Sequence, residues 1–143
     1  MLTVLMATHN GASTLERVLS SYKKIIPPEG GWKLVIVDNA STDLTEEIIR
    51  THQKTLPLEY IKIHQRGKNV ALNHGLKEIE GDIVIFTDDD GIADPTWLID
   101  WRNTADTKKE FSVFGGAIYP VWPSVPPEWI IRLVDLGATF ANQ

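Results

Sequence analysis

The sequence contains no cysteine, which excludes disulfide bonds, thiolate metal ligands and cysteine nucleophiles. Any metal ion bound by this chain must therefore be held by oxygen or imidazole groups. The absence of cysteine also fits a reducing compartment, and we expect the protein to be cytoplasmic.

Long apolar runs are absent as well, so the sequence predicts no membrane-spanning helix. The apolar stretch at residues 1–10 has no basic residues before it and is too short for a signal peptide, so it is predicted to form a buried strand. The net charge is −5, with no stripe of lysine or arginine. This balance disfavours nucleic acid as a partner, because the favourable release of counterions would be missing.

The remaining composition is that of a globular protein, with 43% hydrophobic and 23% charged residues over 143 positions. We expect one domain over residues 1–143. Short apolar runs alternate with amphipathic stretches, which predicts an α/β fold with an open, mainly parallel sheet flanked by helices. The predicted strands are 2–7, 33–37, 58–63, 82–87 and 111–114, and the predicted helices are 15–22, 44–54, 69–79, 95–105 and 128–136.

Two local features refine this prediction. Ser13 or Thr14 is placed to cap the first helix, since a hydroxyl can accept from a free amide of the first turn. The segment 119–128 holds four prolines and is predicted to be irregular.

Polar residues follow three of the predicted strands where each strand ends. These residues are Thr8, His9 and Asn10 after the first strand, Asp38 and Asn39 after the second, and Asp88, Asp89 and Asp90 after the fourth. Ligands of open parallel sheets bind beyond the carboxyl ends of the strands. The three segments therefore predict one shared binding site.

The acidic triplet is the strongest local signal. Side chains alternate along an extended chain, so Asp88 and Asp90 are predicted to face one side and Asp89 the other. Two carboxylates on one side suit Mn²⁺ or Mg²⁺, and such a cation would also offset the repulsion between aspartates and a phosphate. A solvated acidic turn is the alternative, but the apolar run 83–86 favours acids fixed at the edge of a sheet.

Other polar residues leave two interpretations open. Asp38 either caps the following helix or contacts a ligand. Arg66 and Lys68 precede a predicted helix whose amino end attracts anions, but they could also be solvated surface residues. His9 and His64 are more typical of hydrogen-bonding residues than of metal ligands.

Four segments together resemble the family 2 glycosyltransferases, which have the Rossmann-like GT-A fold. They are Thr8-His9-Asn10, the VIVDNASTD run at 35–43, the GKNVALNHG run at 67–75 and the FTDDD run at 86–90, in the order found in that family. Residues 115–116 and the PPEW run at 126–129 extend the likeness over nearly the whole chain.

The resemblance implies transfer of a sugar from a nucleotide-diphosphate sugar, expected to be UDP-linked, to a hydroxyl of a glycan or lipid-linked acceptor. It also implies inversion at the anomeric carbon and a place in cell-surface polysaccharide synthesis. The implied nucleotide-sugar-binding residues are Thr8, His9, Asn10, Asp38, Asn39, Arg66, Lys68, Asn69, Asp88 and Asp89, and the implied metal ligands are Asp90 and Asp88.

The chain departs from this family after the triplet. The family's catalytic base lies in an acidic motif well beyond it, and the 53 residues after Asp90 contain no such motif. We therefore expect a truncated chain whose catalytic base and acceptor-binding part lie elsewhere. Apolar surface exposed by the truncation should lead to self-association. The resemblance also implies that the full-length protein is peripheral at the inner membrane face. One alternative is a donor-binding module without transfer activity. The other is a haloacid-dehalogenase-like phosphatase, because the run at 83–91 also resembles the aspartate-bearing strand and turn of that family, although the likeness is weaker than that to the glycosyltransferases.

Overall fold

The computed structural model describes residues 1–122 and 124–133. The chain divides into two compact units, 1–107 and 108–143, which are described separately here. A single domain over residues 1–143 therefore stays a prediction. In the described part of the chain, no helix has both the length and the apolar character needed to cross a membrane.

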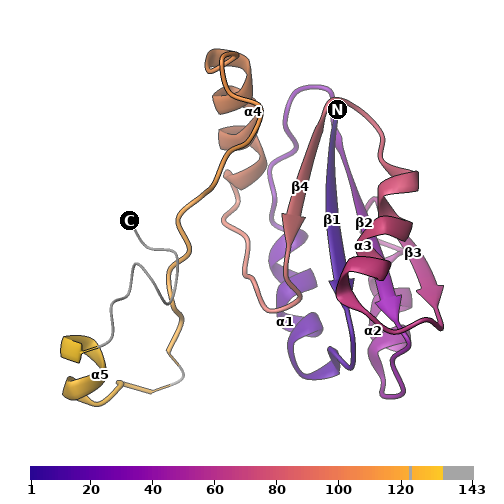
Figure 1. Cartoon of the computed structure of the whole chain (residues 1–143), viewed down its shortest axis with the longest axis vertical. Helices are drawn as coiled ribbons and strands as arrows, with labels where there is room; N and C mark the ends of the chain where they lie inside the picture. The colour runs from indigo at the N-terminus through magenta and orange to yellow at the C-terminus, as the bar shows by residue number, and fades with distance from the viewer. Residues whose placement is uncertain (123, 134–143) are drawn as a thin grey trace. The chain divides into compact units, whose positions relative to one another are not determined.

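The first unit is built on a sheet of four parallel strands in the order β3-β2-β1-β4. The strands are β1 (Leu2–Thr8), β2 (Trp32–Asn39), β3 (Leu58–Ile63) and β4 (Ile83–Thr87). Their arrows point the same way in Figure 1, so the carboxyl ends of all four strands meet at one edge. The predicted α/β fold with a parallel sheet is confirmed.

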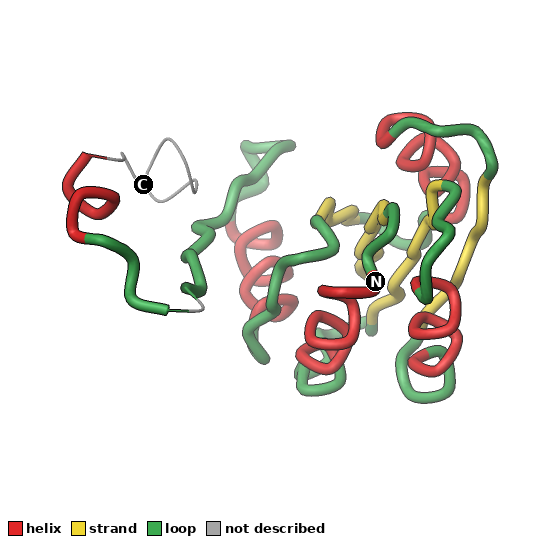
Figure 2. The backbone as a smooth tube through the Cα atoms, turned by 90° about the horizontal axis from the view of Figure 1, so that it is seen from below, coloured by secondary structure: helices red, strands yellow, loops and turns green. Residues whose placement is uncertain are grey.

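Helices cover both faces of this sheet (Figure 2). They are α1 (Ala12–Tyr22), α2 (Thr45–His52), α3 (Lys68–Gly75), which continues into the short 3-10 helix η1 (Leu76–Glu78), and α4 (Trp97–Thr107). Side chains of α1, α2 and α4 share one core cluster, whereas α3 contributes to a second. Two layers of helices therefore enclose the sheet, as its apolar strands require.

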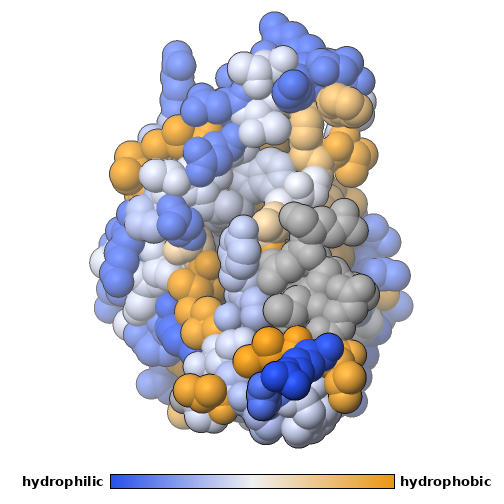
Figure 3. Space-filling view, turned by 90° about the vertical axis from the view of Figure 1, so that its left-hand side faces the viewer, coloured by the Kyte–Doolittle hydropathy of each residue, from blue (hydrophilic) through white to orange (hydrophobic). Residues whose placement is uncertain are grey.

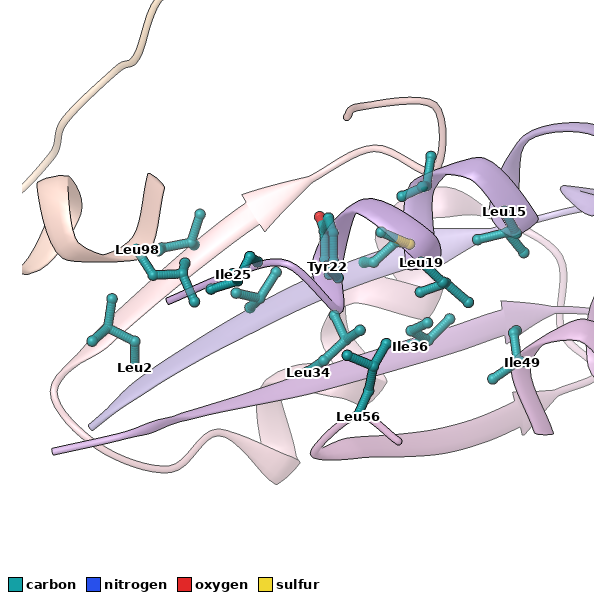
Figure 4. Close-up of a cluster of buried hydrophobic side chains, with 14 residues drawn as sticks. Leu2, Leu15, Leu19, Tyr22, Ile25, Leu34, Ile36, Ile49, Leu56 and Leu98 are labelled. Atoms are coloured by element: carbon teal, nitrogen blue, oxygen red, sulfur yellow. The ribbon is translucent and has the colours of Figure 1, made fainter. Parts of the chain in front are cut away.

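The two clusters follow from the alternation of side chains along the central strand β1. Leu2, Val4 and Met6 belong to the larger cluster, where they pack with Tyr22 of α1 (Figure 4). Leu5 and Ala7 belong to the cluster under α3. Every residue of β1 is buried, so its polar end at Thr8 is fixed from both sides.

The predicted cap of α1 is wrong. The helix begins at Ala12, before both Ser13 and Thr14, and its N-cap residue is Gly11, which has no side chain to offer. Asp43 supplies the missing acceptor, since its Oδ2 accepts from the Ala12 amide at 3.2 Å. The cap thus comes from a neighbouring loop, which a pattern confined to one helix cannot reveal.

The start of α4 also differs from the prediction. Pro95 was expected as the first helical residue, but the helix begins at Trp97. Asp94 explains the shift, because its Oδ1 accepts from the amide and hydroxyl of Thr96, each at 2.9 Å, and forms a turn ahead of the helix.

The second unit contains one helix among its described residues, α5 (Glu128–Leu133). The predicted extension of this helix to residue 136 lies outside the described residues. The predicted strand at 111–114 is wrong. The rings of Phe111 and Phe114 contact each other edge to face at 6.5 Å, whereas residues three apart on a strand face opposite sides. The described part of 119–127 has no regular structure, as its prolines predict.

Candidate active site

A pocket of about 570 Å³ opens at the carboxyl ends of the strands of the first unit. It is lined by Ala7, Thr8, His9, Asn39, Arg66, Gly67, Lys68, Asp88, Asp89 and Asp90. The segments after β1, β2 and β4 thus converge as the sequence predicts, and the loop before α3 joins them. Asn10, Asp38 and Asn69 were expected in the site but do not line this pocket.

The three aspartates have three different environments. Asp88 forms an ion pair with Lys68, and both side chains are exposed. Asp89 accepts a hydrogen bond from the Thr8 hydroxyl. Asp90 is exposed and has no hydrogen-bond or ion-pair partner among residues 1–122 and 124–133. Only the Asp90 carboxylate is therefore free to bind a ligand without losing a bond to the protein.

The bond between Thr8 and Asp89 depends on the glycine that follows β1. A Cβ added to Gly11 would lie 2.8 Å from Asp89 Oδ2 and 3.1 Å from Leu15 Cδ1. Since both distances are shorter than ordinary contacts, Gly11 makes the approach of Asp89 to β1 possible.

Asn39 joins the end of β2 to the loop that precedes α3. Its amide Nδ2 donates to the Gln65 carbonyl at 2.8 Å, and its Oδ1 accepts from the Gly67 amide at 2.8 Å. The Asn39 carbonyl accepts from His9 Nδ1, 2.7 Å away. One residue thus fixes the His9 ring and the cationic loop around the pocket.

Asn10 joins the loops after β1 and β2. It has a left-handed backbone with a φ of 54°, its amide donates to Ser41 Oγ at 2.9 Å, and its Oδ1 accepts from the Thr42 amide at 2.9 Å. These bonds hold Asn10 against a neighbouring loop. Its role here is to shape the rim.

Asp38 is completely buried and its two carboxylate oxygens are both bonded within the protein. Oδ1 accepts from the Ser41 amide at 2.8 Å and Oδ2 from the Tyr60 hydroxyl at 2.8 Å. The interpretation that Asp38 caps the following helix is wrong, because α2 begins at Thr45 and Asp43 accepts from the Thr45 amide, whereas Asp38 holds the loop before it through Ser41. The contact of Asp38 with the nucleotide-sugar stays a prediction, as do the ligand contacts of Asn69.

Charges of opposite sign face each other in the pocket. Arg66 and Lys68 lie on the α3 side and the three aspartates follow β4. Among the described residues, however, no three acidic or histidine side chains form a ready metal cage. The arrangement suits an anionic ligand joined to a cation that the aspartates hold only in part.

Sequence reasoning missed two residues that shape this site, Gly11 and Tyr60. Gly11 gave a usable signal, because a glycine in the turn between a strand and a helix often marks a close approach. Tyr60 gave none, since a tyrosine inside a strand is ordinary.

Residues 3–135 match the glycosyl transferase family 2 profile. Over 90 residues the chain is 30% identical to the poly(ribitol-phosphate) beta-N-acetylglucosaminyltransferase TarS of Staphylococcus aureus, a match covering 62% of this chain and 16% of TarS. The chain therefore spans only a small part of that relative's length.

Two solved structures share the fold. TarS 1-349 from S. aureus in complex with UDP-GlcNAc has a TM-score of 0.69 and 28% identity over 76% of this chain and 32% of that one. The mannosyltransferase PcManGT from Pyrobaculum calidifontis, in complex with GDP-Man and Mn²⁺, has a TM-score of 0.67 and 31% identity over 73% of this chain and 32% of that one.

These matches set aside the phosphatase alternative. The chain belongs to the family 2 glycosyltransferases and has their GT-A fold.

Proposed function

We propose that this pocket binds the nucleotide-diphosphate sugar, with UDP as the nucleotide, for transfer of the sugar to a hydroxyl of a glycan or lipid-linked acceptor. The observation that carries the proposal is the acidic triplet after β4 facing Arg66 and Lys68 within one pocket. Aspartates and cations together fit a diphosphate bridged to a divalent cation, whereas either set alone would not.

The donor chemistry of the pocket fits Mn²⁺ or Mg²⁺. All three acids offer hard carboxylate oxygens, and Mg²⁺ is often held by only one or two carboxylates together with substrate phosphates and water. The missing three-residue cage is therefore no objection. Asp90, helped by Asp88, would hold the ion. When bound, it would supply Lewis-acid stabilisation of the leaving nucleoside diphosphate.

The remaining roles belong to the chain's own side chains. Arg66 and Lys68 orient the diphosphate through charge-assisted hydrogen bonds. Asn39 and His9 shape the nucleotide side of the pocket, and Thr8 holds Asp89 in place. Inversion requires a carboxylate base near the acceptor hydroxyl, and we place that base outside residues 1–143.

The other parts of the proposal concern the whole protein. We place it in the cytoplasm, peripheral at the inner membrane face in its full-length form, and in cell-surface polysaccharide synthesis. A donor-binding module without transfer activity is the second candidate.

Calorimetric titration of UDP, with and without Mn²⁺, tests the proposal. Wild-type binding should require Mn²⁺ and should disappear in Asp90→Ala. Glu47→Ala removes an exposed carboxylate on α2, outside this pocket, and should bind as wild type. Binding unaffected by chelation would exclude the metal. No binding of UDP, GDP or dTDP would overturn the donor site.

Hydrolysis of a UDP-sugar separates the two candidate functions. A transferase part that positions the leaving group should release UDP slowly into water, whereas a pure binding module should release none. UDP release is measured with Mn²⁺ present, and Asp90→Ala is the blank.

A further inference from the structure

The buried carboxylate of Asp38 needs two strong donors, because an ionised group without hydrogen bonds is very costly inside a protein. The loop after β2 supplies one donor, the Ser41 amide at 2.8 Å. The other comes from a different element, the Tyr60 hydroxyl of β3, also at 2.8 Å. The position of the Asp38 side chain therefore depends on β3.

Asp38 and Asn39 are neighbours that face opposite sides of the sheet. Asn39 lines the pocket and bonds the loop before α3, while Asp38 points to the side on which Tyr60 packs with the larger core cluster. Because they share a peptide unit, fixing Asp38 from one side also fixes Asn39 on the other.

Tyr60 is itself held in place from outside. The Arg50 guanidinium lies over its ring, 5.1 Å from the centroid. Arg50 pairs with Glu46 at 2.9 Å, and Glu46 pairs with Lys62 at 2.7 Å. Burial, followed by the bond to Asp38, raises the pKa of the Tyr60 phenol, so the hydroxyl stays a donor at neutral pH.

We infer that Tyr60 is a positioning residue of the nucleotide pocket, which acts through Asp38 to hold Asn39 and the 39–42 loop in their binding geometry. The inference rests on the proposed function for the nature of the ligand. Tyr60 does not line the pocket, so its effect on binding is indirect.

Tyr60→Phe removes the hydroxyl and keeps the ring beneath Arg50. UDP affinity in the presence of Mn²⁺ should fall about tenfold, the size expected when a hydrogen bond to a charged group is lost. In the free protein, amide exchange at Ser41 should become faster. The destabilisation control is Ile25→Val, at a buried residue of the larger core cluster that does not line the pocket. Binding is measured well below both melting temperatures, where Ile25→Val should bind as wild type.

A double-mutant cycle with Asp38→Asn tests the route. If Tyr60 acts through Asp38, the double variant should bind UDP no more weakly than the weaker single variant. If the loss of UDP affinity in the double variant equals the product of the losses in the two single variants, the inference is overturned. Unchanged UDP affinity and unchanged Ser41 exchange in Tyr60→Phe would also overturn it. Wild-type protein that binds no nucleotide would overturn the proposed function instead, and the exchange measurement would still decide whether Tyr60 holds the loop.

Discussion

At the scale of single residues, Asp43 has an unusual position, because its one carboxylate accepts hydrogen bonds from the first residues of two helices. Its Oδ2 accepts from the Ala12 amide of α1 at 3.2 Å, and its Oδ1 accepts from the Thr45 amide of α2 at 3.1 Å. Negative charge at a helix amino end is stabilising. Asp43 therefore stabilises both helices at once.

This position makes stability depend on pH. Partial burial acts to raise the pKa of Asp43, but the bonds from Thr45 and Ala12 together hold that pKa below its ordinary value of 3.8. The ionised Asp43 carboxylate therefore stabilises the folded protein at pH values above its ordinary pKa. This stabilisation is lost as the pH falls through the folded-state pKa. Asp43→Asn should lower the free energy of unfolding by about 0.3–1 kcal/mol at neutral pH, because the amino ends of two helices lose a nearby negative charge.

Urea unfolding at several pH values checks this expectation. The wild type should lose more stability than Asp43→Asn as the pH falls from about 5 through the folded-state pKa of Asp43, so the two curves should converge only below that pKa. A constant difference between them would show that the Asp43 charge has no part in the effect.

Gly11 gives the second prediction at this scale. Gly11→Ala would place a methyl group 2.8 Å from Asp89 Oδ2, so the bond between Asp89 and Thr8 must move. We expect a loss of about 1–3 kcal/mol in the free energy of unfolding, as for other overpacked sites. Gly115→Ala is the matched control, since nothing lies within 4 Å of its added Cβ. Equal stability of the two variants would contradict this account.

At the scale of elements, α3 lies unusually close to the sheet. A Cβ on Gly75 would lie 3.0 Å from Val37 Cγ2 and even closer to Leu5 Cδ1. Helix propensity alone favours alanine by about 1 kcal/mol, whereas overpacking a buried contact costs about 1–3 kcal/mol. Gly75→Ala is therefore expected to destabilise the protein.

Thermal unfolding of a compensated pair tests this packing. Leu5→Val removes the δ carbons that the new methyl group would meet. The double variant Leu5→Val with Gly75→Ala should lose less stability than the sum of the two single variants. Simple additivity would mean that the two side chains do not compete for the same space.

The elements of the first unit were predictable because their apolar runs are short and well separated. The four strands and the helices between them lie close to their predicted positions. Which residue of β2 faces the pocket was not predictable. Alternation separates Asp38 from Asn39, but β2 is buried on both faces, so the pattern does not tell which face leads to the ligand.

The acidic triplet was more predictable than the rest of the site. Asp88 bonds Lys68 at the start of α3, and Asp89 bonds Thr8 at the end of β1, so the two neighbours have partners on different elements. The predicted alternation of the three side chains stays a prediction, because β4 ends at Thr87 and the triplet lies in the turn that follows. The bond from Tyr60 to Asp38 could not be predicted, because it joins β3 to β2 and the sequence alone does not give the order of the strands in the sheet.

At the scale of the whole molecule, apolar groups reach the surface in several places (Figure 3). The sheet ends at β4, which carries no charged residue and pairs only with β1 in the described part of the chain. Phe86 on this strand is 54% exposed. Unprotected edge strands favour pairing with other chains, so we propose that the protein self-associates there.

Sedimentation velocity at several concentrations checks this proposal. The wild type should form larger species as the concentration rises, and Phe86→Lys should shift that onset to higher concentration because a charge on an edge strand opposes pairing. Thr51→Lys adds the same positive charge at an exposed residue of α2, near β3 at the other edge of the sheet, and is the control for net charge. A wild type that stays monomeric throughout would contradict the proposal.

The hydrogen bond from Thr8 to Asp89 joins residues 81 positions apart. Strands β1 and β2 and the loop before α3 are all synthesised before β4. A growing chain would therefore already contain the pocket residues that follow β1 and β2 while the three aspartates after β4 were still missing. Contacts so distant in sequence form late in folding, because much chain entropy is lost first. The proposed affinity for a divalent cation should therefore be the last property the molecule gains as it folds and the first it loses as β4 detaches.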